Sequence, residues 1–427
     1  MLLICWSAWA QPAPDAAAPP PASAATDEPA MHLAQRRARL DADDVAGRLD
    51  LAAYARDADL PLIATELYRE VLAIDADHEQ AYDAWTKLAD LHPLPEDEQR
   101  LSELAERFDE MTAQTTEHFI VLSDGEDRWA RARAMLLERT HDYYYRNLRR
   151  AGFRPRPLTE RLVCVLYADH ADYVAYAKRV DNVDMGWSGG YFSTRTNRIV
   201  FYDDRTGPAF QELRDRVSQL EQQVEQLRRD IDRAGRQRQY ALAQQLRRQR
   251  EHALKQQRFY RNRSEALAKL GNAAKAAHEA THQLAYNSGL QRPDRVYPFW
   301  FSEGLATSFE TDEPARPFGP FRENTYRLQA VMQLLADDKL IPLKTLVSAR
   351  RPPAEPREAI EAMYNQAWAL FAYLFRERRD DLRAYLRHIA SLDPGERSAE
   401  QLHDEFVEAF GPVDQVEAAF RKHIKRQ

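Results

Sequence analysis

The sequence has very little cysteine, no long apolar run and no excess of positive charge. Only Cys5 and Cys164 occur among 427 residues, and Cys5 lies in a segment expected to be removed, so no internal disulfide can form in the mature chain. No stretch of about 18 apolar residues is present, so a membrane-spanning helix is not expected in the mature chain. The net charge of −7 gives no general attraction to nucleic acid or to an anionic membrane, and no basic nucleic-acid module is evident.

The beginning of the chain is typical of an exported protein. Residues 1–10, MLLICWSAWA, are apolar and end in an A-x-A pattern at Ala8 and Ala10, and the Pro- and Ala-rich residues that follow, to residue 30, indicate a disordered linker. The apolar stretch is short and lacks a basic start, as it would if the true start lay further upstream. We therefore expect export to the periplasm or cell envelope. Cys5 follows three aliphatic residues rather than a small one, so a lipid anchor is not expected.

Residues 31–115 have helical apolar spacing with small and large positions similar to a tetratricopeptide repeat. The positions that match best are Leu51, Ala52, Ala64, Tyr68 and Leu72. The segment is long enough for one to one and a half repeats, which cannot form a long peptide-binding groove. We favour a packing role for this region over a peptide-binding role.

Residues 116–207 change character and predict a small α+β lobe. EHFIVLSD and RLVCVLYAD are strand-like, and each is followed by a helical pattern. Cys164 lies in the second of these strands, where a cysteine is usually a core residue rather than a nucleophile. Residues 185–204 predict a hairpin with a polar turn around Thr194 to Asn197. Its edge strand could pair with an extended substrate, or Gly189 and Gly190 could simply serve a bend or bulge.

Residues 208–270 predict an antiparallel coiled-coil hairpin, inserted between the α+β lobe and the remaining helices. Apolar residues recur at alternating steps of four and three, as in a heptad seam, and a break at Ala234–Gly235 allows a returning helix, which gives an arm roughly 35 Å long. Between residues 212 and 258 there are 12 Lys plus Arg against 7 Asp plus Glu. This basic arm could suit a protein or anionic-polymer partner, or the charge could only solvate the coiled coil. The outgoing seam contains Leu213, Val217, Leu220, Val224, Leu227 and Ile231, and the returning helix contains Leu242, Leu246, Ala253 and Tyr260.

Residues 271–427 are helix-rich and contain the strongest chemical signal, HEATH at residues 278 to 282. Histidines four residues apart lie on one helical face, so His278 and His282 can reach a single ion. Glu279 is then free to act as a general base on bound water, and a catalytic zinc usually takes a third protein ligand, for which Glu303 is the candidate. His388, His403 and His423 lack ligand spacing and predict no second metal site.

HEATHQLAYNSGL followed by WFSEGLATSFE resembles the gluzincin clan of zinc peptidases, and together with YNQAWALFAYL it is similar to an uncharacterised bacterial gluzincin-like family known only as a domain of unknown function. The resemblance covers about residues 116–427. It implies peptide-bond hydrolysis, with His278, His282 and Glu303 as ligands, and it places Tyr364 where aminopeptidases of the clan have a tyrosine that stabilises the oxyanion. Tyr364 could equally be a packing aromatic at the start of a helix.

Two features differ from better-known relatives. Thermolysin-like enzymes carry an aspartate four residues after the glutamate ligand, where this chain has Thr307, with Glu310 one further turn on. The groups that support the zinc ligands are therefore left open. No Gly-x-Met-Glu-Asn-like element precedes HEATH, so aminopeptidase activity does not follow from the resemblance.

The sequence thus predicts an α+β, mostly helical protein with a gluzincin-like catalytic module. Its predicted function is that of a zinc-dependent peptidase-like hydrolase acting on peptides or proteins, in which metal-activated water attacks the carbonyl. The alternative is a non-catalytic scaffolding protein with the same fold that acts through its repeat-like region and its arm.

Overall fold

The computed structural model describes residues 27–75, 78–91, 94, 97–186, 188–270 and 273–427. The predicted signal peptide with Cys5, and most of the predicted linker, lie outside these residues. The chain divides into two compact units, residues 1–92 and residues 93–427. None of the described helices combines the length and the apolar content needed to cross a membrane.

The first unit is a small helical bundle with its own core. It consists of α1 (Asp27–Arg37), α2 (Val45–Asp57), α3 (Pro61–Ile74) and α4 (Glu79–Leu91). Asp44 caps the start of α2 by accepting from the backbone of Gly47, and Pro61 begins α3, where a missing N–H is harmless. The five positions that match the repeat pattern are all buried in this core.

A five-stranded mixed sheet begins the second unit, in the order β1-β2-β3-β5-β4. The central strands β2, β3 and β5 run parallel, and the edge strands β1 and β4 are antiparallel to their neighbours. The bounds are β1 (Thr112–Thr115), β2 (Phe119–Ser123), β3 (Leu162–Tyr167), β4 (Gly190–Ser193) and β5 (Arg198–Tyr202). The strands β2 and β3 are buried along their whole length, as expected for parallel strands covered on both faces.

Alternate residues of these strands pack into two different cores. On one face Phe119 and Cys164 join a large core with α6 (Asp127–Arg150) and the helical lobe. On the other face Ile120 and Val163 pack with α5 (Glu98–Arg107), α7 (His170–Tyr176) and the π-helical turn Ala177–Asp181. The prediction that Cys164 is a core residue is confirmed, because it is fully buried.

Two boundaries differ from those expected from the sequence. The sequence places α5 in the N-terminal helical region, residues 31–115. In the structure Leu104 and Phe108 instead pack against the sheet and α7. The sheet begins at Thr112, before the expected start at residue 116. The additional strand is β1, a short and largely exposed edge strand. Its sequence, TAQT, has no apolar alternation from which a strand could be predicted.

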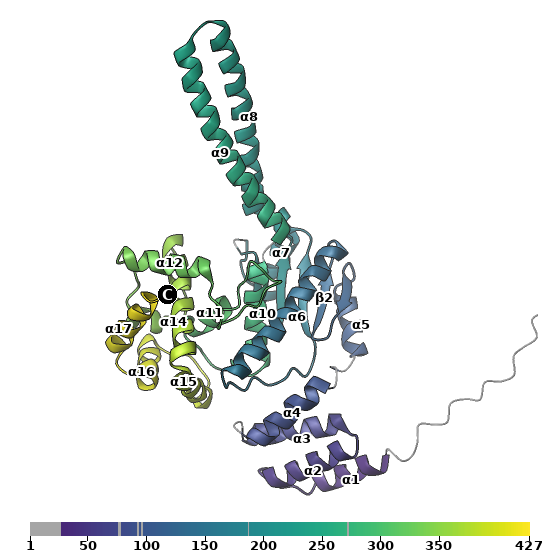
Figure 1. The fold of residues 1–427 in the computed structure, drawn as a ribbon. Helices are drawn as coiled ribbons and strands as arrows, with labels where there is room; N and C mark the ends of the chain where they lie inside the picture. The colour runs from purple at the N-terminus through teal and green to yellow at the C-terminus, as the bar shows by residue number, and fades with distance from the viewer. Residues whose placement is uncertain (1–26, 76–77, 92–93, 95–96, 187, 271–272) are drawn as a thin grey trace, which may run out of the picture. The chain divides into compact units, whose positions relative to one another are not determined.

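Figure 1 shows the predicted arm as a long helical hairpin of α8 (Pro208–Arg236) and α9 (Tyr240–Leu270), which follows a 3-10 turn at Asp204–Thr206. The 29 residues of α8 correspond to about 43 Å, longer than expected, because the helix runs from Pro208 through Ala234–Gly235 to Arg236. The outgoing seam residues are buried or half-buried. On the returning helix the seam prediction was wrong at Leu242, which is 44% exposed, while the adjacent Ala243 is buried.

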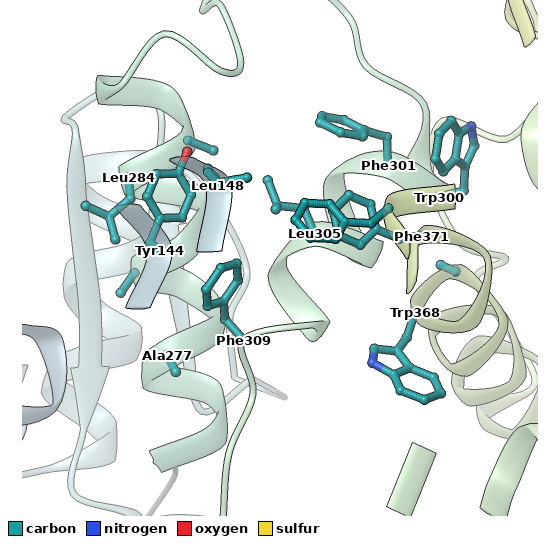
Figure 2. Packing of buried hydrophobic residues seen from close by; sticks show 14 of the residues in the cluster. Tyr144, Leu148, Ala277, Leu284, Trp300, Phe301, Leu305, Phe309, Trp368 and Phe371 are labelled. Carbon is teal, nitrogen blue, oxygen red and sulfur yellow. The ribbon is translucent and has the colours of Figure 1, made fainter. Parts of the chain in front are cut away.

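The helical lobe completes the second unit, and its core is continuous with that under the sheet. Figure 2 shows Ala277 and Leu284 of α10 beside Tyr144 and Leu148 of α6, with Phe309 between them and the rest of the lobe. The helices are α10 (Ala273–Asn287), α11 (Phe299–Thr307), α12 (Thr325–Ala336), α13 (Leu343–Val347), α14 (Arg357–Glu377), α15 (Arg379–Ser391), α16 (Ala399–Phe410) and α17 (Val413–Ile424).

Candidate metal centre

The helix α10 presents both predicted histidine ligands on one face. Its sequence, AAKAAHEATHQLAYN, places alanines on the side that packs against α6 and the sheet, and Ala276, Ala277 and Ala280 are essentially fully buried. Small side chains let the helix lie close to its neighbours. His278 and His282 therefore lie inside the protein, with their Nε2 atoms 3.2 Å apart.

Glu303 reaches the same point from α11. Phe299, Trp300 and Phe301 are buried just before it and fix the start of this helix in the core. Gly304 lets α11 cross α14 closely, because a Cβ at this position would lie 2.6 Å from the carbonyl oxygen of Ala367. The helix crossing thus holds Glu303 in place against α10.

The three side chains have the spacing of ligands around one ion. Glu303 Oε2 lies 3.1 Å from His278 Nε2, and Glu303 Oε1 lies 3.6 Å from His282 Nε2. A tetrahedral ion with bonds of about 2.0–2.1 Å requires ligand atoms about 3.3 Å apart. The side chains of His278, His282 and Glu303 can therefore hold a metal ion.

The electrostatics of the group favour a positive charge between these ligands. Burial disfavours a charged His278, but hydrogen bonds to Glu303 and Glu310 outweigh burial and raise the pKa of this imidazole to about 10. Burial likewise disfavours a charged Glu303, yet the positive charge of His282 and the hydrogen bond from His278 lower the pKa of this carboxyl. The carboxylates that favour a protonated His278 would also favour a divalent cation, which binds the deprotonated imidazole in place of the proton.

Glu310 and Arg327 support His278 at Nδ1, the ring nitrogen that does not face Glu303. The Nδ1 atom of His278 lies 3.0 Å from Glu310 Oε1. Arg327 on α12 holds the Glu310 carboxylate with two hydrogen bonds of 2.7 Å, from its Nε and Nη2 atoms, and donates a third to Asn365. A carboxylate on the outer nitrogen of a histidine ligand fixes the ring orientation and makes the ring a better ligand.

Glu310 is therefore the group that supports a histidine of the candidate site, a group that the sequence left open. Thr307, at the position of the aspartate of thermolysin-like enzymes, instead donates to the Glu303 carbonyl at 2.6 Å and is fully buried. Glu310 is seven residues after Glu303, a spacing that indicates the same side of a helix. The helix α11 ends at Thr307, however, so the spacing alone does not predict the contact.

The Glu310→Gln variant is expected to bind metal about 10–100-fold more weakly. The amide accepts a weaker hydrogen bond from His278 and loses the charge that Arg327 now neutralises. Competition against a chelator of known affinity measures the change. Glu313→Gln is the control, because Glu313 is an exposed carboxylate close by in the sequence that pairs with Arg316 at the surface. Equal affinities of the two variants would contradict a supporting role for Glu310.

The side chain of Glu279 extends from α10 to the edge strand β4. Its Oε2 accepts from the backbone N–H of Phe192 at 3.0 Å. Burial raises the pKa of Glu279, and the charges of His278 and His282 oppose this shift only in part. A carboxylate with a raised pKa accepts a proton more readily. Because Glu279 lies beside the three ligands without being one of them, it is suited to this role.

Tyr364 of α14 also lies beside the group. Its ring centroid is 6.4 Å from that of His278, and the ring packs edge-on against Phe299 at 5.1 Å. Burial, together with the charges of Glu303 and Glu279, raises the pKa of the phenol. Tyr364 therefore keeps its proton and can donate a hydrogen bond, so both its packing role and a donor role are consistent with its position.

A hollow of about 860 Å³ lies between the base of the arm and the helical lobe. Ala274 lines it from α10, one helical turn before His278, and Asp312 and Arg357 line it from the lobe. The arm contributes Ala209, Glu212, Leu213, Arg216, Tyr260, Arg263, Ala266 and Leu267. The base of the arm thus shares this hollow with the start of the helix α10 that carries both histidines.

A second group of metal-ligand residue types, which the sequence analysis missed, contains His118, Glu138 and His141. The rings of His118 and His141 are stacked, with centroids 3.5 Å apart and planes inclined by only 20°. The lone pairs of an imidazole lie in its plane, so two stacked rings cannot direct theirs to one ion. Glu138 instead accepts from both the backbone N and Nδ1 of His118, at 2.8 and 2.7 Å. This arrangement ties α6 to the start of β2.

Removing the charge of Glu138 is expected to destabilise the protein in a pH-dependent way. Burial raises its pKa, but the hydrogen bonds from His118 outweigh burial and lower the pKa below the ordinary 4.5. A depressed folded-state pKa gives stability that is present above the ordinary value and lost as pH falls through the folded-state value. Glu138→Gln should therefore cost about 1–3 kcal/mol at pH 7, and less as the pH falls below about 4.5.

Thermal unfolding at several pH values measures this difference. Glu117→Gln provides the control. Glu117 is 70% exposed, and its carboxylate lies 4.0 Å from Nε2 of His118, which is too far for a hydrogen bond. A destabilisation by Glu138→Gln that stayed constant down to low pH would show that the charge of Glu138 is not its source.

Comparison with known families adds one result. Residues 272–396 match the family described as "Protein of unknown function (DUF1570)", that is, 125 of 427 residues. The prediction of a similarity to an uncharacterised domain family is confirmed for this segment, which is shorter than expected but contains the ligands, Glu279, Glu310 and Tyr364. Membership of the gluzincin clan stays a prediction. No curated protein matches the chain.

Proposed function

We propose that this chain is a zinc-dependent peptidase-like hydrolase. The observation that carries the proposal is the geometry of His278, His282 and Glu303, whose nitrogen and oxygen atoms lie 3.1–3.6 Å apart. Two imidazoles and one carboxylate form a ligand set typical of catalytic zinc, which keeps a further position for water or substrate. Glu279 lies next to this set without belonging to it.

The residues of the chain have complementary roles in the proposed reaction. A zinc ion bound here would supply a Lewis acid that polarises a carbonyl and makes water more acidic. Glu279 takes the proton from the attacking water and passes it to the leaving amine. Tyr364, which keeps its proton, donates to the oxyanion that forms at the carbonyl carbon. Glu310 and Arg327 hold His278 in position throughout.

The substrate fits best as an extended peptide between β4 and the hollow at the base of the arm. The strand β4 is an edge strand, and such strands bind peptides through their backbone with little side-chain selectivity. The N–H of Phe192 already donates a hydrogen bond to Glu279. We therefore assign the backbone hydrogen bonds to the substrate to the neighbouring groups of β4. We assign further residues of the peptide to the hollow, which Ala274 of α10 lines one helical turn before His278.

The proposal is tested by measuring metal content and hydrolysis on the same preparation. The protein, purified without chelator, is expected to contain about one zinc per chain and to cleave members of a peptide library detected by mass spectrometry. Chelation should abolish cleavage, and added zinc should restore it. A folded protein that binds no zinc from solution would exclude the mechanism. Bound zinc without cleavage of any peptide would favour the scaffolding alternative.

A further inference from the structure

Several charges in the body of the arm are paired within the arm. Glu225 accepts from Arg228 at 2.8 Å and lies 3.6 Å from Arg229. Lys255 pairs with Glu251 within α9, and Arg261 reaches across to Glu221 of α8 at 2.7 Å. Such pairs are typical of a coiled coil whose charged surface faces water.

The end of the arm is different. We define the arm tip as residues 233–250, which contain six arginines and no acidic residue. Arg236, Arg238, Arg247 and Arg248 are exposed, and no carboxylate of the described residues forms an ion pair with them. The cluster of positive charge stands on a protein with a net charge of −7, so it is a local feature and not a consequence of composition.

The arm tip also exposes apolar side chains beside these arginines. Tyr240, at the start of α9, is 73% exposed, and Leu242 is 44% exposed. At this level Ala234 and Ala243 are the buried seam residues, and a large part of Tyr240 and of Leu242 faces water. Figure 1 shows the turn that joins the two helices at the far end of the hairpin.

We propose that the arm tip docks on the surface of an anionic phospholipid bilayer. Arginines near such a surface are attracted by its negative potential. Tyrosine is enriched at the boundary between lipid and water, and an arginine can lay its stem on apolar surface while its charge stays among the headgroups. An anionic polymer would satisfy the arginines equally well but would leave Leu242 without an apolar environment. The combination of both side-chain types therefore favours a bilayer.

The charge distribution also defines the orientation of the bound protein. Outside the arm tip the chain has more acidic than basic residues, so an anionic surface repels it. Contact would be confined to the tip, and the length of α8 would hold the rest of the second unit away from the surface. This inference is independent of the proposed hydrolysis and does not require zinc.

Sedimentation of the full chain with lipid vesicles tests the proposal. Binding is expected to vesicles of phosphatidylcholine mixed with the anionic lipid phosphatidylglycerol. It should weaken with salt and be absent with phosphatidylcholine alone. Substituting Arg236, Arg238, Arg247 and Arg248 by Gln should lower the partition constant by about fivefold per arginine, on the order of several hundredfold together. The double variant Tyr240→Ser with Leu242→Ser should lower it about tenfold.

The control removes the same charge elsewhere. Arg128, Arg316, Arg351 and Arg426 are exposed and lie outside the tip, so their combined substitution by Gln should leave binding unchanged. Equal losses for the two fourfold variants would overturn the proposal. So would binding that depends on the tip arginines but not on Tyr240 and Leu242, with equal affinity for a soluble polyanion, because the partner would then be a polymer. Circular dichroism checks that each variant keeps its helices.

Discussion

Alanine in place of His282 is expected to reduce bound zinc from about one per chain to nearly none. The two ligands that remain, His278 and Glu303, leave too few protein donors for a stable site, because a catalytic zinc typically requires three. His278 would then keep its proton in hydrogen bonds to Glu303 and Glu310, and this proton would compete further with the metal. Metal analysis of the purified protein measures the change.

Thermal unfolding gives a second, independent measure of the same effect. A metal that binds only the folded state raises the unfolding midpoint, so chelation should lower the midpoint of the unmodified chain and leave that of His282→Ala unchanged. His252→Ala is the matched control, since His252 is exposed on the arm. If the His282→Ala variant retained one zinc and its chelator-dependent stability, the metal would be bound elsewhere.

The ligands could be predicted from sequence because most of their geometry is local. A helix places residues four apart on one face whatever the tertiary structure, so HEATH specifies the relation of His278 to His282. The heptad spacing of α8 specifies its seam in the same way. Glu303 lies on another helix, and its position depends on the crossing of α11 with α14 at Gly304. The sequence offers Glu303 as a candidate third ligand, which the resemblance to known peptidases supports, but no local pattern specifies that crossing.

The supporting groups were harder to predict because they depend on contacts between distant elements. Arg327 reaches Glu310 from a different helix across 17 residues, and no local pattern relates the two. His118 meets Glu138 across 20 residues for the same reason. At the end of the arm, the turn between α8 and α9 decides which residues of α9 face the seam. The assignment of Leu242 there was wrong by one position, with Ala243 buried in its place.

Glutamine in place of Glu279 is expected to lower the rate of hydrolysis by about 10²–10⁴-fold while zinc content stays at that of the unmodified chain. Glutamine has nearly the same shape and can still accept from the N–H of Phe192, so the contact between α10 and β4 is preserved. It cannot accept a proton from water. The substitution also removes a carboxylate whose burial already disfavours its charge, so the fold should not be weakened.

Two comparisons separate the loss of a base from other causes. Glu279→Asp keeps a carboxylate but shortens its reach, and it should retain more activity than the glutamine variant. Glu358→Gln, on the exposed start of α14, should have no effect. Full activity of Glu279→Gln with bound zinc would mean that another group takes the proton from the water. Because Tyr364 keeps its own proton, it could not be that group, and the proposed division of roles at this site would be wrong.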